Sequence, residues 1–265
     1  MPANRYERLL EHVFFAHYET GAAEVVFDRD ELVAAAEKLD IALPKNLGDI
    51  VYSFRYRAEL PASVADTAPE GKSWIIRPAG PGRYRFVATS LTHVLPREGM
   101  AQTKVPNATP GVIEMYALTD EQSLLAKLRY NRLIDIFTGL TCYSLQSHLR
   151  TTVKGLGQIE TDELYVGVDR RGVHTILPVQ AKGGRDRLNV VQIEQDLAMC
   201  AVKYGSLPCR PIAAQFVESS RIAMFEFEMA EELVSLVRER HYQLVPPEEL
   251  SAEDLQRYMK RSEEA

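Results

Sequence analysis

Polar side chains that could bind a divalent cation gather in two successive stretches in the second half of the sequence. Glu160 and Asp162 lie in the first stretch, and Gln180 and Lys182 end the second. Because side chains alternate along a strand, residues two apart share a face, so each pair is expected on one face. If the two stretches pair across the short turn 169–172, an acid, an amide and an ammonium surround one point.

Such a set of groups suits a hard cation and a phosphate ester. Mg²⁺ takes oxygen ligands from carboxylates, amide and backbone carbonyls and water. Held against a phosphodiester, it polarises the phosphoryl oxygens and lowers the pKa of a bound water. Lys182 can orient or deprotonate that water, or offset charge on the phosphate. The hypothesis from these residues is therefore Mg²⁺-dependent phosphodiester hydrolysis.

The elements that must position these residues follow from hydrophobic periodicity and from glycine and proline breaks. In the second half, Asp120 or Thr119 is expected to cap a long helix that ends before Gly139. The predicted elements are a helix over 121–138, strands over 143–153, 158–168 and 173–182, a helix over 190–204, strands over 211–217 and 222–227, and a helix over 230–240.

At these residues the sequence resembles the PD-(D/E)XK nuclease superfamily, whose core has the order α-β-β-β-α-β. Asp162 matches the aspartate on the second core strand, and Gln180-Ala181-Lys182 matches the (D/E)-x-K motif on the third. Glutamine in place of the acid is similar to the Mrr-like branch. The resemblance covers roughly residues 119–220. It implies Asp162, the Gln180 oxygen and the Ala181 carbonyl as Mg²⁺ ligands, and Lys182 as a catalytic residue.

The glutamine at position 180 removes one negative charge from that pattern. Glu160, two residues before Asp162, can restore it, whereas Glu163 is expected on the other face of the strand. Glu121 on the preceding helix is a further candidate, since some superfamily members use a helix acid. His148, on the first core strand, is expected to have a structural role rather than one in DNA contact.

The first half has the order of a winged helix. The patterns predict helices over 6–18, 31–39 and 45–57, a strand over 24–27, and a hairpin formed by 74–77 and 83–87. In a winged helix the third helix enters the major groove and the hairpin touches the DNA backbone. The expected DNA-binding residues are Lys45, Asn46, Arg55, Arg57, Arg77, Arg83 and Arg85. The alternative is a small α+β domain with a solvated basic face.

The predicted fold class is therefore α/β (α+β), with a restriction-endonuclease-like core after a small winged-helix-like domain. The expected division is a winged-helix-like domain over 1–96, a linker over 97–118, a nuclease-like domain over 119–245, and a charged C-terminal helix or tail over 246–265. With 265 residues, 46% hydrophobic and 26% charged, the chain is not expected to be disordered, collagen-like or a coiled coil.

The cysteine count and the N-terminal pattern indicate the cellular compartment. Three cysteines without a CxxC pair argue against a disulfide framework. No signal-peptide pattern and no run of about 18 apolar residues is seen, so a cytoplasmic protein outside the membrane is expected. The net charge of −6 is concentrated near the C-terminus, while residues 41–90 are basic, which fits local contact with phosphates.

Together these patterns predict an endonuclease of duplex DNA that resembles type II restriction enzymes. Cutting two strands with one site per chain favours a homodimer. One alternative is a nuclease fold without activity that binds DNA or assembles complexes, a reading that the glutamine at position 180 keeps open. The other is a repair or structure-specific nuclease.

Overall fold

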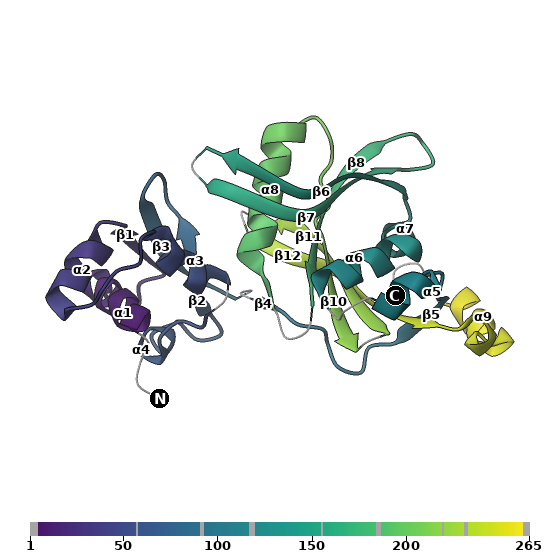
Figure 1. The fold of residues 1–265 in the computed structure, drawn as a ribbon, viewed down its shortest axis with the longest axis horizontal. Helices are drawn as coiled ribbons and strands as arrows, with labels where there is room; N and C mark the ends of the chain where they lie inside the picture. Colours follow the sequence, from purple (N-terminus) through teal and green to yellow (C-terminus); the bar gives the residue numbers. More distant parts are fainter. Residues whose placement is uncertain are drawn as a thin grey trace. The chain divides into compact units, whose positions relative to one another are not determined.

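The computed structural model describes residues 5–56, 58–90, 93–116, 120–154, 156–183, 187–218, 220–230 and 233–261. The protein is mixed α/β, with 34% helix and 38% strand. It divides into two compact units (Figure 1). The first unit comprises 1–94, 151–159 and 189–195; the second comprises 95–150, 160–188 and 196–265.

The first unit contains helices and a three-stranded antiparallel sheet in which β3 lies between β1 and β2. Its elements are α1 (Arg5–His17), β1 (Glu24–Asp28), α2 (Glu31–Leu39), α3 (Gly48–Tyr56), α4 (Ala62–Ala65), β2 (Ser73–Pro78), β3 (Arg83–Thr89) and β4 (His93–Val94). The apolar stripe of α1 packs against the sheet, with the rings of Phe14 and Phe86 edge to face at 5.0 Å. The predicted helix, strand, helix, helix and hairpin are all present.

The third helix is shorter at its start than predicted. It begins at Gly48, not at Lys45, because the Asn46 side chain accepts the Gly48 backbone N–H at 3.1 Å and forms a turn there. Lys45 and Asn46 therefore precede the helix and do not lie on its surface. Short polar side chains that bond the backbone two residues on compete with helix formation in this way.

The second unit is built on a curled mixed sheet of seven strands in the order β5-β12-β11-β10-β8-β7-β6 (Figure 1). Its strands are β5 (Gln102–Pro106), β6 (Thr141–Val153), β7 (Gly157–Val168), β8 (His174–Lys182), β10 (Ile212–Glu218), β11 (Arg221–Ala230) and β12 (Leu233–Val245). The short strand β9 (Leu188–Asn189) is not part of this sheet. The β8–β10 and β5–β12 pairs are parallel, whereas the β7–β8, β10–β11 and β11–β12 pairs are antiparallel. The predicted β-meander over 143–182 is confirmed.

Helices cover both faces of this sheet. They are α5 (Gly111–Tyr116), α6 (Glu121–Tyr130), α7 (Leu133–Thr138), α8 (Val190–Tyr204), the 3-10 turn η1 (Pro247–Glu249) and α9 (Ala252–Met259). Apolar residues of α6 and α7 pack with Val179 and Ala181 of β8. The side chain of Gln180, which lies between Val179 and Ala181 in the strand, points to the other face and contacts Asp196 of α8. From Asp196 onward, α8 therefore covers the face of the sheet opposite to α6 and α7.

Two predicted helices of this unit are wrong. The helix predicted over 121–138 is two helices, because Arg132 adopts a left-handed backbone with φ of 53° after Asn131. The Asn131 side chain accepts the Ala108 N–H, which holds that break. Of the residues predicted as a helix over 230–240, Ala230 ends β11 and residues 233–240 lie in strand β12, which pairs with β11 from Leu233 to Gln243. That pairing outweighs the helical propensity of its charged residues.

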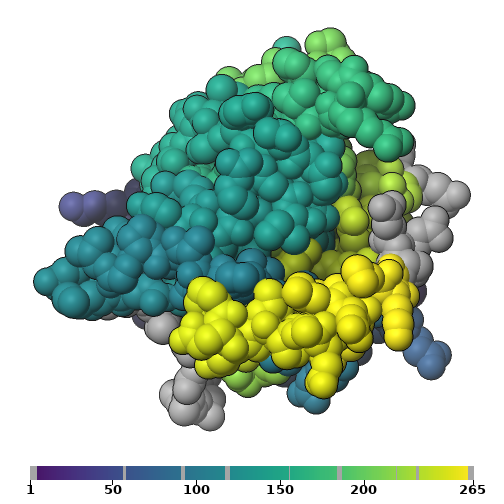
Figure 2. Space-filling model, turned by 90° about the vertical axis from the view of Figure 1, so that its right-hand side faces the viewer, coloured from purple at the N-terminus to yellow at the C-terminus, as the bar shows by residue number. Residues whose placement is uncertain are grey.

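The segment 97–118 was expected to be a linker, yet it carries β5 and α5. Strand β5 pairs in parallel with β12 at the edge of the sheet. Its Lys104 amide donates to the Tyr258 hydroxyl of α9 at 2.8 Å, and its ammonium lies 3.1 Å from Asp254. Figure 2 shows the surface of this region, with α9 in yellow beside the blue-teal segment of β5 and α5. Among the described residues, no helix is long and apolar enough to span a membrane.

Candidate active site

The predicted site residues lie where β7 and β8 stop pairing with each other. Their antiparallel register ends at Glu163–Val179, while β8 continues to pair with β10 through Lys182. We call the residues Glu160–Asp162 and Gln180–Lys182 the strand fork. Its backbone groups are no longer engaged in the ladder between the two strands, so side chains satisfy them.

Asp162 is held at the strand fork by the backbone of β8. Its Oδ2 accepts the N–H of Ala181 at 2.8 Å. Burial raises the pKa of this carboxyl, the Ala181 N–H and the charge of Lys182 lower it, and the charge of Glu121 raises it further. Asp162 therefore lies in a partly desolvated environment close to one ammonium and a second carboxylate.

Lys182 connects the strand fork to helix α6. It is only 9% exposed, and its Nζ donates to Oε1 of Glu121 at 2.8 Å. Gly183, the next residue, makes this approach possible, since a Cβ there would lie 2.8–2.9 Å from backbone atoms of Asp120 and Glu121. Asp120 begins the helix by accepting the Ser123 N–H. The helix start and the strand end thus place Glu121 against Lys182.

Gln180 makes a different contact from the expected metal–oxygen one. It is 1% exposed, and its Nε2 donates to Oδ2 of Asp196 at 2.9 Å and to the backbone oxygen of Glu160 at 3.2 Å. Both partners are acceptors, so the amide nitrogen must face them. Gln180 and Lys182 therefore contact different helices, although strand alternation predicts one shared face.

Asp196 is a carboxylate that the sequence analysis missed. It is completely buried, and its Oδ1 accepts the hydroxyl of Thr161 at 2.5 Å. Burial raises the pKa of Asp196 to about 7, against the lowering effect of the bonds from Thr161 and Gln180. A signal for it exists in the sequence: Asp196 is an acid on the face of α8 that also carries the buried Ile193, Met199 and Cys200.

The other two candidate glutamates have partners away from Asp162. The carboxylate of Glu160 pairs with Arg150 of β6 at 2.8 Å and is well exposed. Glu163 is buried and is bound by Arg129 at 3.0 Å and by the hydroxyls of Ser147 and Tyr165. The expectation that Glu160 completes the metal site is therefore not supported by its contacts, and Glu121 is the acid found beside Lys182.

His148 lies closer to this site than its expected structural role implies. Its backbone has a φ of 49°, a left-handed conformation inside strand β6, and its Nε2 is 3.1 Å from the Gln122 amide. Its charge is among those that lower the pKa of Asp162. A non-glycine residue in this conformation is unusual within a strand, and periodicity does not predict it.

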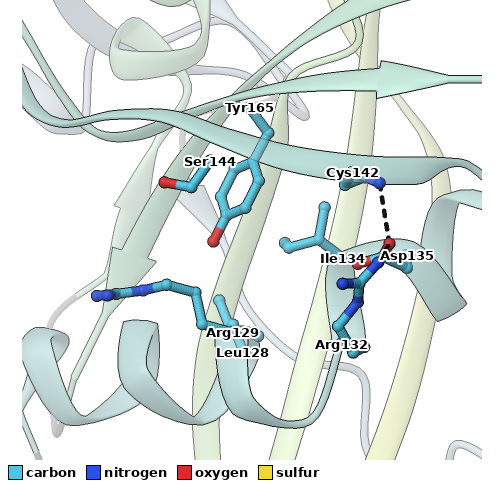
Figure 3. Close-up of a pocket in the computed structure, with 8 residues that line it drawn as sticks. All are labelled: Leu128, Arg129, Arg132, Ile134, Asp135, Cys142, Ser144 and Tyr165. Carbon is cyan, nitrogen blue, oxygen red and sulfur yellow. Dashed lines mark hydrogen bonds and ion pairs between the residues drawn. The ribbon is translucent and has the colours of Figure 1, made fainter.

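A small cavity of about 160 Å³ lies elsewhere on the second unit, over the break between α6 and α7 (Figure 3). Leu128, Ile134 and the Tyr165 ring form its apolar part. Its charges are compensated, because Arg132 pairs with Asp135 and Arg129 pairs with Glu163. The strand-fork residues do not line it, so it is separate from the candidate site.

The donor set at the strand fork suits Mg²⁺ but is small. Among the described residues, no group of three or more His, Cys, Asp or Glu side chains could hold a metal. Mg²⁺, however, is commonly held by one or two carboxylates, with water and substrate phosphates completing the shell. Asp162 and Glu121 supply two carboxylates here, and the Lys182 ammonium already lies against one of them, as a cation would. The residues therefore fit the ion.

The expected DNA-binding arginines of the first unit are paired with acids. Arg83 lies 2.9 Å from Asp28 and Arg85 lies 3.2 Å from Glu24. The hydrogen bond from Arg83 holds the pKa of Asp28 below its ordinary value.

Of the remaining residues of that set, Lys45 is exposed, and the others contact residues of the first unit or lie outside the described chain. The Arg77 Nε donates to Glu194 at 2.8 Å, and the side chain is mostly buried. Asn46 donates to Asp49, and the backbone oxygen of Arg55 accepts from Asn189. Arg57 lies outside the described residues.

Comparison of the chain with protein-family models, curated proteins and solved structures found no match.

Proposed function

We propose that this protein is a Mg²⁺-dependent endonuclease of duplex DNA, of the restriction type, with a PD-(D/E)XK-like core. The observation that carries the proposal is the convergence of Asp162, Lys182 and Glu121 at the strand fork. A buried ammonium between carboxylates, at the end of a strand, is an arrangement suited to a phosphodiester and a cation.

The order of elements supports the same core. Helix α6 is followed in the chain by α7, β6, β7, β8, α8 and β10, and β8 pairs in parallel with β10. That succession matches the α-β-β-β-α-β order implied by the resemblance, with the helix broken in two. Asp162 and the Gln180–Lys182 segment occupy the second and third strands of this succession, as the motif requires.

In this proposal each residue has a chemical task. Asp162 and Glu121, with the Ala181 carbonyl, would hold the ion, which when bound would polarise the phosphoryl oxygens and lower the pKa of a water. Lys182 donates hydrogen bonds from Nζ to the attacking water or to a phosphoryl oxygen. The Ala181 N–H fixes Oδ2 of Asp162, so that carboxylate keeps one orientation. Gln180 contributes through the hydrogen bonds of its buried amide nitrogen and is not required as a ligand of the ion.

We further propose that the first unit positions the duplex. Its order of elements is that of a winged helix, with α3 as the groove helix and the β2–β3 hairpin as the wing. DNA phosphates would then replace the carboxylates of Asp28 and Glu24 as partners of the hairpin arginines. A homodimer would bring two strand forks to the two strands of a palindromic target.

A second candidate function is a DNA-binding or assembly protein that keeps the fold without cleavage. The observation that favours it is the amide of Gln180, which lacks the charge of the usual acid and is engaged by Asp196.

Digestion of unmodified phage and plasmid DNA by the full chain separates the two candidates. We expect cleavage with Mg²⁺ and none with EDTA. Discrete fragments indicate a sequence-specific enzyme, whereas cleavage confined to branched or damaged substrates indicates a repair nuclease. DNA binding without cleavage in Mg²⁺ or Mn²⁺, on methylated and unmethylated substrates, would contradict the proposal and support the second candidate.

A further inference from the structure

We propose that Asp196 is a positioning residue that fixes the separation of β7 and β8 at the strand fork and thereby holds Asp162 and Lys182 in place. Its effect on cleavage rests on the proposed function. Its effect on the geometry of the strand fork does not, and it can be measured without DNA.

The first support is the pattern of hydrogen bonds around the carboxyl. Each oxygen accepts from a different strand: Oδ1 from the Thr161 hydroxyl of β7 at 2.5 Å and Oδ2 from the Gln180 amide of β8 at 2.9 Å. Thr161 directly precedes Asp162, and Gln180 is two residues before Lys182. One side chain of α8 therefore connects the two strands next to both proposed site residues.

The second support is the place at which this connection occurs. The backbone register between β7 and β8 ends at Glu163–Val179, so the ladder does not set the distance between the strands beyond that point. Side chains take over: Asp196 joins Thr161 to Gln180, Gln180 also donates to the Glu160 carbonyl, and Asp162 accepts from Ala181. These bonds replace those that a continuous ladder would supply.

The third support is burial. Thr161 and Asp196 are 0% exposed and Gln180 is 1% exposed. Water cannot replace a lost partner in such a place without opening the structure, so removal of the carboxyl takes from the Thr161 hydroxyl and the Gln180 amide a bond that solvent does not restore. Asp196 is thus a side chain outside the two strands that bonds to both of them at the strand fork.

The bonds do not require a charged carboxyl. The Thr161 hydroxyl can donate or accept, so Asp196 can keep both contacts when protonated. Asparagine can do the same, with its amide nitrogen donating to Thr161 and its oxygen accepting from Gln180. Asp196→Asn is therefore the conservative variant that should rescue, and Asp196→Ala is the one that should not. Thr161→Ser and Thr161→Val form a second matched pair that leaves the carboxyl in place.

The test is amide hydrogen exchange on the full chain, read at the Ala181 N–H, which donates to Asp162. Amides of Ala214 and Met224, in strands with partners on both sides, serve as references. We expect Asp196→Ala and Thr161→Val to speed exchange at Ala181 by about tenfold or more relative to the references. Asp196→Asn and Thr161→Ser should stay within about threefold of wild type.

An unchanged exchange rate at the Ala181 amide would overturn the proposal. An equal rise in the exchange rate at all three amides would also overturn it, because that result describes a buried acid that stabilises the whole unit. If Asp196→Ala does not fold, the two Thr161 variants decide the question. In the cleavage assay, Asp196→Ala should lower kcat by about tenfold with little change in KM, and Asp196→Asn should restore it. If wild type does not cleave DNA, the proposed function fails while the exchange result still decides the role of Asp196.

Discussion

The basic hairpin of the first unit and the strand fork of the second unit treat their charges in opposite ways. On the hairpin, Arg83 and Arg85 are 55% and 40% exposed, and each pairs with one acid of the same unit. At the strand fork, the carboxyl of Asp196 and the ammonium of Lys182 are buried and the carboxyl of Asp162 is half-buried, with Glu121 beside Lys182. The acids there outnumber the single lysine.

This difference separates charge that is solvated from charge that is available for chemistry. An exposed pair in water contributes about 0–1 kcal/mol and is easily exchanged. Burial is the main cause of the raised pKa values of Asp162 and Asp196, and the charge of a neighbouring acid raises each of them further. A cation relieves the repulsion between these acids. The strand fork is therefore the better candidate for the site of reaction, although the hairpin is the more basic part of the sequence.

The largest expected effect distinguishes two glutamates. Glu121→Gln removes the charge that lies against Lys182, and we expect it to lower the cleavage rate by about 10²–10³-fold. Glu160→Gln, the matched control, alters an exposed pair with Arg150 and should change the rate by less than about fivefold. Single-turnover rates with Mg²⁺ provide the measurement. Equal losses in the two variants would show that the contacts of Glu121 do not define the site.

The next effect is a pH dependence of stability due to Asp196. The folded pKa of about 7 is higher than the ordinary value of 3.8, so the native state binds this proton more tightly than the unfolded chain. The contribution is complete below about pH 4 and is lost as the pH rises to 7, with an expected size on the order of 4 kcal/mol.

Urea unfolding of wild type and Asp196→Asn from pH 4 to 8 measures this contribution. The variant cannot titrate at this position, so its stability relative to wild type should increase with pH. A difference that is constant across the range would show that Asp196 has an ordinary pKa. Comparing the two proteins at each pH removes the titrations that they share, including that of Asp162.

A smaller effect concerns the contact between Gly183 and the start of α6. Gly183→Ala places a methyl group 2.8 Å from backbone atoms of Asp120, and we expect a loss of about 1–3 kcal/mol in the free energy of unfolding. Gly111→Ala, which meets nothing within 4 Å at the start of α5, is the control and should not destabilise. Equal stability of the two variants would mean that the helix can move away from β8.

The smallest effect is expected from the hairpin arginines. Because their acid partners already neutralise them, Arg83→Ala combined with Arg85→Ala should weaken DNA binding by less than about fivefold. Asp28→Asn with Glu24→Gln should strengthen binding at low salt, since it frees both guanidinium groups. Fluorescence anisotropy over a salt series measures both. A loss of a hundredfold in the arginine variant would mean that the hairpin is the main DNA contact.

Local sequence patterns predicted the helices and strands around the site well. They failed where contacts between residues distant in sequence determine the secondary structure. Alternating apolar residues and glycine turns located β6, β7 and β8, because each strand carries its own pattern. Residues 230–240 were wrongly predicted as helix, since a run with Arg and Glu is compatible with a helix until β11 pairs with it.

The contacts of the candidate site were predicted only in part, for the same reason. Asp162 and Lys182 were selected as candidates because their types and spacing match strand geometry and resemble a known motif. The bond between Gln180 and Asp196 was not predicted and Asp196 was missed, since that bond joins β8 to α8 across 16 positions of sequence. Glu121 remained one candidate among several, because the contact that selects it depends on the close approach that Gly183 permits.

The most direct test of the central claim is Mg²⁺-dependent cleavage of supercoiled plasmid by wild type, Lys182→Ala and Lys203→Ala. Lys203 is an exposed lysine of α8 and controls for loss of positive charge. We predict cleavage by wild type and Lys203→Ala, and a rate about 10³-fold lower for Lys182→Ala with DNA binding retained. Cleavage by Lys182→Ala at the wild-type rate would contradict the assignment of the strand fork as the active site.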